Sequence, residues 1–213
     1  MNIEFKKEYL KKRIIVDVGS SAYPLQAYGT PDEDAEIFLF EPRPDFYQEL
    51  VDKYGNEENY HLSTLALSNN IGTSTFYSTQ KRNCSSLFEP NKEEENINKR
   101  WEEAFNYETF DVETNTLDNV FQDFERVDYM KLDTQGNEYD ILSAGKELLT
   151  KTMFVKVEVH LTEYYKGQKF MEDYIELFKS LDFEEMLWKR QISPDGLFQD
   201  AFFANNRDME FVV

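Results

Sequence analysis

The chain has 213 residues, of which 40% are hydrophobic and 15% aromatic, and these proportions predict one packed domain, residues 1–213, rather than a disordered chain. Its formal charge is −19, so its surface repels phosphate backbones and anionic membranes, and we expect neither nucleic acid nor a membrane as partner. One cysteine and two histidines exclude an internal disulfide, a cysteine metal site and a histidine-rich metal site. A signal peptide and a run of about 20 apolar residues are both missing, so we expect a cytoplasmic protein.

The first predicted strand holds an apolar run at residues 14–16 that leads into Asp17 and Gly19. A short apolar run that ends in a Gly-Ser turn is typical of a strand buried on both faces, as in a parallel sheet. Small residues at its carboxyl end, Gly19 with Ser20 and Ser21, allow backbone N–H groups to approach a ligand. An ordinary strand followed by an Asp-Gly turn is the alternative.

Strands and helices alternate through the first half of the chain. The predicted elements are a helix over residues 2–11, a helix over 22–28, a strand over 37–42, a helix from 44 to 55, a strand over 60–68 and its hairpin partner over 73–77. This order indicates a doubly wound α/β sheet.

The second half begins with an irregular stretch, residues 78–108, which we predict to be a loop and a helix inserted over one end of the sheet. The elements predicted after it are a strand over 110–112, a helix capped by Thr116, a strand over 127–133, a helix over 137–150, a strand over 154–161, a helix over 170–181, and a closing antiparallel hairpin of 183–190 with 197–205. On the strand over 154–161, Val155, Val157, Val159 and Leu161 share one face, and the opposite, polar face should meet water or a polar cleft.

Three acids fall at carboxyl ends of predicted parallel strands: Asp17, Glu41 and Asp133. Ligands of open α/β sheets bind at this edge. Glu41 follows Gly19 by about 20 residues, where an acid can bond both ribose hydroxyls of an adenosine cofactor. The full G-x-G-x-x-G is missing, which disfavours the pyrophosphate cofactors NAD and FAD, whereas S-adenosylmethionine carries no phosphate. An exposed strand end is the alternative for Glu41.

Several short motifs resemble, in the same order, the FkbM-type methyltransferase family. They are D-V-G at 17–19, F-E-P at 40–42, A-L-S at 66–68, S-S-L at 85–87, T-L-D at 116–118 and K-L-D-T-Q-G-N-E at 131–138, and the last is the most specific. The resemblance covers roughly residues 13–160. It implies a class I methyltransferase (Rossmann-like) fold with a mostly parallel sheet, S-adenosylmethionine as methyl donor, and a hydroxyl of a sugar, a glycan or a small natural product as acceptor.

The resemblance also implies roles for single residues. Asp17 and Gly19, with Ser20 and Ser21, would hold the methionine end of the cofactor, and Glu41 would bind the ribose. Ala66 and Ser68 would lie beside the adenine. Asp133, Gln135 and Glu138 belong to the signature motif, Asp133 would also bind the cofactor, and Glu158 ends the fifth strand. One departure from the family pattern D-x-G-A-N-x-G is Tyr23, whose bulk stands where the cofactor's carboxylate end would pass.

A mechanism follows as a hypothesis. Methyl transfer to a hydroxyl needs an aligned donor and acceptor and a base for the proton. Asp133 is the first candidate base, Glu158 and His160 are the next, and Gln135 would orient the acceptor. The alternatives are a turn cap for Asp133 and a solvated strand face for Glu158 and His160.

Other options stay open. A divalent cation held by Asp133 and Glu158 is one, although we predict no metal site. A binding or scaffold domain that has lost the cofactor and an NAD-linked oxidoreductase are the rival functions, and calorimetry would separate the first of these from an enzyme. Self-association into a homo-oligomer is compatible with the sequence.

Overall fold

The structure is a computed structural model that describes residues 11–21, 34–93, 106–194 and 196–207. Residues 2–10 of the first predicted helix, the helix predicted over 22–28, Tyr23 and the helix predicted around Trp101 lie outside these ranges.

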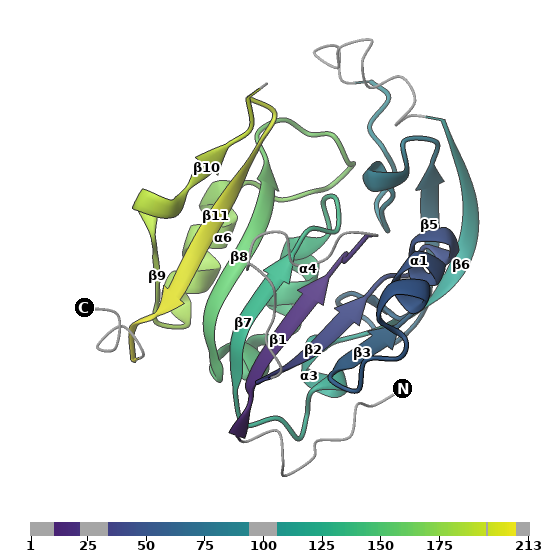
Figure 1. Ribbon diagram of the computed structural model, residues 1–213. Helices are drawn as coiled ribbons and strands as arrows, with labels where there is room; N and C mark the ends of the chain where they lie inside the picture. The colour runs from purple at the N-terminus through teal and green to yellow at the C-terminus, as the bar shows by residue number, and fades with distance from the viewer. Residues whose placement is uncertain (1–10, 22–33, 94–105, 195, 208–213) are drawn as a thin grey trace.

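A mostly parallel sheet forms the centre of the described chain (Figure 1). Its strands are β1 (Arg13–Val18), β2 (Ala35–Phe40), β3 (Tyr60–Ser63), β7 (Val127–Leu132), β8 (Thr152–His160), β9 (Phe183–Glu185), β10 (Gln191–Ile192) and β11 (Phe198–Asn205). The order is β10-β11-β8-β7-β1-β2-β3, with β9 also paired to β11. Strands β3, β2, β1, β7 and β8 are parallel, and β11 runs antiparallel to β8. The predicted α/β class with a C-terminal antiparallel hairpin is confirmed.

Helices cover both faces of this sheet because its central strands are apolar on both faces. On one face lies α1 (Pro44–Tyr54), which ends at Gly55 as predicted, and its Leu50 packs on Ile15, Ile37 and Leu39. On the other face lie α3 (Leu117–Val120), α4 (Glu138–Ser143), α5 (Lys146–Leu149) and α6 (Met171–Ser180), which share the larger core with β1, β7 and β8 (Figure 1). Among the described helices, none is long and apolar enough to span a bilayer.

A second, three-stranded sheet stands beside the first and corrects two predictions. It contains β4 (Ala66–Leu67), β5 (Gly72–Thr79) and β6 (Tyr107–Asn115) in the order β4-β6-β5. The strand predicted over 60–68 is therefore two strands in different sheets, and the Ser63 hydroxyl accepts from the Leu65 N–H where the chain turns. The predicted hairpin was wrong as well, because β6 lies between β4 and β5.

Three further boundaries differ from the predictions. The helix predicted over 137–150 is two helices separated at Gly145, where a Cβ would stand 2.7 Å from the Leu117 Cβ. The strand predicted over 183–190 ends at Glu185, and a 3₁₀ turn separates it from β10. Leu161 follows β8 and is 42% exposed, so it is not part of the apolar face of that strand.

Candidate functional site

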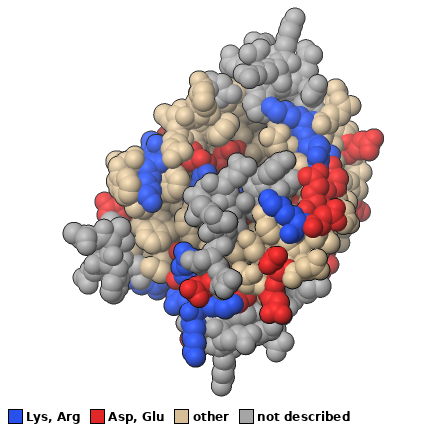
Figure 2. Space-filling model, viewed as in Figure 1, with Lys and Arg blue, Asp and Glu red and all other residues tan. Residues whose placement is uncertain are grey.

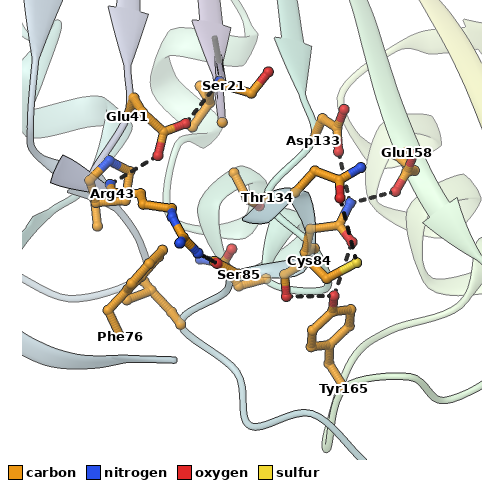
Figure 3. A pocket seen from close by; sticks show the side chains of 18 of the residues that line it. Ser21, Glu41, Arg43, Phe76, Cys84, Ser85, Asp133, Thr134, Glu158 and Tyr165 are labelled. Carbon is orange, nitrogen blue, oxygen red and sulfur yellow. Dashed lines mark hydrogen bonds between the residues drawn. The ribbon is translucent and has the colours of Figure 1, made fainter. Parts of the chain in front are cut away.

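A cavity of about 240 Å³ opens at the carboxyl ends of the parallel strands (Figure 3). The predicted site residues that line it are Gly19, Ser21, Glu41, Ala66, Asp133, Gln135, Glu158 and His160. Asp17, Ser20 and Ser68 do not line it. The Ser68 N–H bonds the Asn115 carbonyl and its hydroxyl lies 3.3 Å from Asn70 Oδ1, so Ser68 belongs to the small sheet.

Asp17 and Lys131 fix the turn after β1 through bonds on the side away from the cavity. The Asp17 carboxylate is fully buried, and the Lys131 ammonium donates to Asp17 Oδ1 at 3.0 Å and to the Gly19 carbonyl at 3.2 Å. Lys131 Nζ also lies 3.6 Å from Asp133 Oδ2. Burial alone would lower the pKa of Lys131, but the charges of Asp17 and Asp133 prevail and raise it above its ordinary value. Lys131 thus links the turn after β1 to the end of β7.

Gly19 and Ser20 show why this turn needs small residues. Gly19 has φ +73°, and a Cβ there would stand 2.0 Å from the Asp133 carbonyl oxygen, so no larger residue fits. The Ser20 hydroxyl is buried and donates to the Asp17 carbonyl at 2.8 Å. The turn after β1 and the loop after β7 therefore pack directly against each other.

Glu41, at the end of β2, is a buried carboxylate in the cavity wall. Its Oε2 accepts from the Ser21 N–H at 2.8 Å and its Oε1 from the Arg43 N–H at 2.9 Å (Figure 3). Burial raises the pKa of Glu41 to about 7, although both N–H donors oppose this shift. Among the described residues only these two donate to the carboxylate, and each of its oxygens has two lone pairs, so it can accept further bonds from a ligand.

The loop after β7 is shaped by Glu138. This buried carboxylate accepts from the Thr134 N–H at 2.6 Å and from the Gly136 N–H at 2.9 Å. Burial raises the pKa of Glu138 to about 7. Gln135, with φ +63°, sits in the left-handed region that non-glycine residues rarely adopt, and such strain is found where the surrounding structure fixes a functional conformation.

Gln135 connects the acids of β7 and β8. Its Nε2 donates to Asp133 Oδ1 at 3.0 Å and to Glu158 Oε1 at 2.8 Å. On the other side of its amide, the Tyr165 hydroxyl lies 3.0 Å from Gln135 Oε1 and 2.9 Å from the Cys84 carbonyl (Figure 3). The structure therefore brings together Asp133, Gln135 and Glu158, and adds a tyrosine from a loop far along the chain.

Glu158 and His160 are buried on the polar face of β8, which faces the cavity rather than bulk water. His160 Nε2 lies 3.6 Å from Glu158 Oε1. Burial, reinforced by the charges of Asp133 and Glu138, raises the pKa of Glu158 well above its ordinary value. Burial lowers the pKa of His160 to about 4, so its imidazole is neutral near pH 7 and resists protonation.

Some lining residues could not be identified from the sequence. Tyr164 and Tyr165 reach the cavity from the loop after β8, and Phe198 reaches it from the first position of β11, so that the three rings surround His160. No motif marked them. Lys131 is the first residue of the K-L-D-T-Q-G-N-E motif, but nothing in the motif predicts an ion pair with Asp17.

A divalent cation between Asp133 and Glu158 would need oxygen ligands in a suitable arrangement. Within the described ranges, no three His, Cys, Asp or Glu side chains are grouped to hold a cation. Between Asp133 and Glu158, the Gln135 amide places N–H donors where a cation would need oxygen ligands.

Comparison with known proteins now identifies relatives. The family model described as Methyltransferase FkbM domain matches residues 27–185, which is well over half of the chain, and confirms the resemblance seen in the motifs. The 2-O-methyltransferase NoeI of Sinorhizobium fredii is 27% identical over 179 residues, which are 81% of this chain and 71% of that protein.

Solved structures agree in fold. Sp1610 of Streptococcus pneumoniae, described as a tRNA methyltransferase in complex with S-adenosylmethionine, matches with a TM-score of 0.51 at 12% identity, over 94% of this chain and 72% of its own. The fibrillarin of Aeropyrum pernix with natively bound S-adenosylmethionine matches with a TM-score of 0.50 at 10% identity, over 91% of this chain and 66% of its own. At these identities the likeness supports the class I methyltransferase fold and nothing finer.

Proposed function

Because this chain belongs to the FkbM methyltransferase family and is an S-adenosylmethionine-dependent methyltransferase, we propose that it transfers the methyl group to a hydroxyl oxygen of a sugar, a glycan or a small natural product. The family membership decides against the NAD-linked oxidoreductase that the sequence left as a rival.

One observation carries the proposal: a single cavity joins two different walls. On one wall, Glu41 and Ser21 stand at the ends of β2 and β1. On the other, Asp133 and Glu158 stand at the ends of β7 and β8. We assign the first wall to the nucleoside and methionine parts of the cofactor and the second to the acceptor, so that the two would meet near Asp133.

The residues of the first wall suit the cofactor. The Glu41 carboxylate is fixed by two backbone N–H groups and keeps lone pairs for ribose hydroxyls. Gly19 lines the cavity beside Ser21, and we assign the methionine chain to this stretch of the wall. In this arrangement Asp17 and Ser20 are positioning residues, because they hold the turn without lining the cavity.

The residues of the second wall suit a hydroxyl acceptor. When bound, the cofactor supplies a methyl group on a sulfonium, and the acceptor oxygen must lose its proton as it takes the methyl group. We keep Asp133 as the base, because Lys131 and Gln135 hold its carboxylate in the cavity wall. Glu158 and His160, buried behind it on β8, stay the second candidates for the base.

A sugar is favoured by the mixture of groups around the acceptor wall. The Tyr164, Tyr165 and Phe198 rings offer apolar faces, while the Asp133 carboxylate offers acceptors for sugar hydroxyls. The 2-O-methyltransferase activity named for NoeI supports an oxygen acceptor.

The surface charge supports the expectation of no nucleic acid partner. Over α1 in Figure 2, basic side chains lie beside a group of acidic ones, and Arg82 pairs with Asp45 at 2.9 Å and with Glu49. Such pairs neutralise the cations that a phosphate backbone would need. The cytoplasm remains our proposed compartment, on the grounds given by the sequence.

Product analysis tests the proposed acceptor chemistry. The protein is incubated with S-adenosylmethionine carrying a ¹³C methyl group and with mono- and oligosaccharides, glycolipids and phenolic natural products, and products are examined by NMR. We expect a methyl ether. A labelled N-methyl amine or C-methyl product would overturn the hydroxyl acceptor, and the Asp133→Asn variant serves as the matched control.

A further inference from the structure

Two buried oxygens in the cavity wall have no hydrogen-bond partner within the part of the chain that the structure describes. They are Thr134 Oγ1 and Asn137 Oδ1, and both residues line the cavity. A buried polar atom without a partner costs about 1–3 kcal/mol, and such atoms are uncommon in folded proteins. A ligand that donates a hydrogen bond at this place would remove that cost.

The amide of Asn137 has only one reasonable orientation. One end of it lies 3.2 Å from the Leu67 carbonyl oxygen, which can accept but not donate. That end must therefore be the NH₂ group. The oxygen is left as a pure acceptor in a side chain that is 2% exposed, and it has no partner among the described residues.

Asn137 stands on the nucleoside side of the cavity. Its partner Leu67 lies in β4, and the neighbouring wall is apolar, with Phe40, Leu65 and Ala66. Such a wall suits the flat faces of a purine whose ribose is held by Glu41. Thr134 stands next to it, with its methyl carbon 3.2 Å from the place of a Cβ on Gly19, at the seam between the turn after β1 and the loop after β7 (Figure 3).

We propose that Asn137 Oδ1 accepts a hydrogen bond from the exocyclic amine of the cofactor's adenine, and that the Thr134 hydroxyl gains a partner on the same nucleoside. The assignment rests on the proposed function, because it uses Glu41 to place the ribose. Asn137 then selects adenine over a purine that carries a carbonyl at the amine position, because Asn137 Oδ1 and that carbonyl oxygen are both acceptors and cannot bond each other.

The direct test changes the ligand rather than the protein. Isothermal titration calorimetry measures S-adenosylhomocysteine against S-inosylhomocysteine, its analogue with a carbonyl in place of the amine. We expect the wild-type protein to bind the analogue about 10- to 100-fold more weakly. In Asn137→Leu the difference should fall below about threefold. Equal binding by the wild type overturns this assignment alone, whereas no binding of either compound overturns the proposed function with it.

A second variant keeps the assignment testable if Asn137→Leu does not fold. Thr134→Val removes only the unpartnered hydroxyl, so we expect an unchanged or higher Tm without ligand, and about three- to tenfold weaker binding of S-adenosylhomocysteine. The matched control is Thr152→Val, which removes a buried hydroxyl that donates to the Leu148 carbonyl at 2.9 Å. It should lower Tm and leave binding unchanged. If Thr134→Val also had a lower Tm and unchanged binding of S-adenosylhomocysteine, Thr134 would have no role in binding the ligand.

Discussion

The two walls of the cavity hold their carboxylates in different ways. Glu41 is fixed by backbone N–H groups of Ser21 and Arg43, so any sequence that forms this turn supplies the same donors. Asp133 and Glu158 are fixed by the side chain of Gln135, which a single substitution can remove. The difference teaches that the wall we assign to the cofactor is set by the fold, whereas the wall we assign to the acceptor is set by side chains, which substitutions can change.

Lys131 joins the two walls, and its removal should have the largest effect. Lys131→Met leaves the buried Asp17 without the ammonium that faces it, and breaking a buried pair in this way costs about 3 kcal/mol or more. Urea denaturation measures the loss in free energy of unfolding. Lys151→Met is the control, because its exposed pair with Glu147 is worth about 1 kcal/mol or less. Similar losses in the two variants would contradict a shared anchor.

Asp133→Asn should separate the walls by function. If Asp133 is the base, kcat falls about 100-fold, which is within the usual range for general base catalysis. Binding of S-adenosylhomocysteine should change less than about threefold, because the cofactor wall keeps its backbone donors. Methyl transfer to the acceptor found by NMR and calorimetry provide the two measurements. An unchanged kcat would remove Asp133 from the role of base.

The pH dependence of stability should have opposite signs for Glu41 and for His160. Burial raises the pKa of Glu41 from 4.5 to about 7, so the folded state holds more protons than the unfolded state between these values. The stability that this group contributes is present below about pH 4.5 and lost as pH rises through about 7. His160 has its pKa lowered from 6.5 to about 4, so its contribution is present above about pH 6.5 and lost as pH falls through about 4.

Glu41→Gln isolates the first of these effects. Between about pH 5 and pH 8, the variant should lose less unfolding free energy than the wild type, by on the order of 1–2 kcal/mol. Urea denaturation at several pH values provides the comparison, and His160→Gln is the companion that should alter only the acid side. Parallel curves for Glu41→Gln and the wild type would show that Glu41 is ionised like an exposed acid.

Sequence reasoning located the parallel strands because their apolar runs leave few alternatives. Residues 14–16 and 37–40 are apolar without interruption, and acids at the strand ends predicted one edge, which the cavity at Glu41 and Asp133 bears out. The strand over 60–68 failed because the change of sheet depends on the local turn at Ser63, which has no strong sequence signal. The helix over 137–150 failed because the reason for its break, the contact of Gly145 with Leu117, is a tertiary one.

The acceptor wall was the less predictable part of the site. Glu158 and His160 alternate with valines, which indicates a polar face but not what covers it. Tyr165 reaches Gln135 across 30 positions of sequence, and Lys131 reaches Asp17 across 114. Contacts at such separations follow from strand order, so only the folded chain shows them.

The most direct test of the account is calorimetry of S-adenosylhomocysteine with the wild type, Glu41→Ala, and Glu125→Ala, an exposed acid outside the cavity lining. We predict binding by the wild type and by Glu125→Ala, and about tenfold weaker binding, or about 1.4 kcal/mol, by Glu41→Ala. No heat from the wild type at millimolar ligand, or equal affinity in all three proteins, would contradict a nucleoside site built around Glu41.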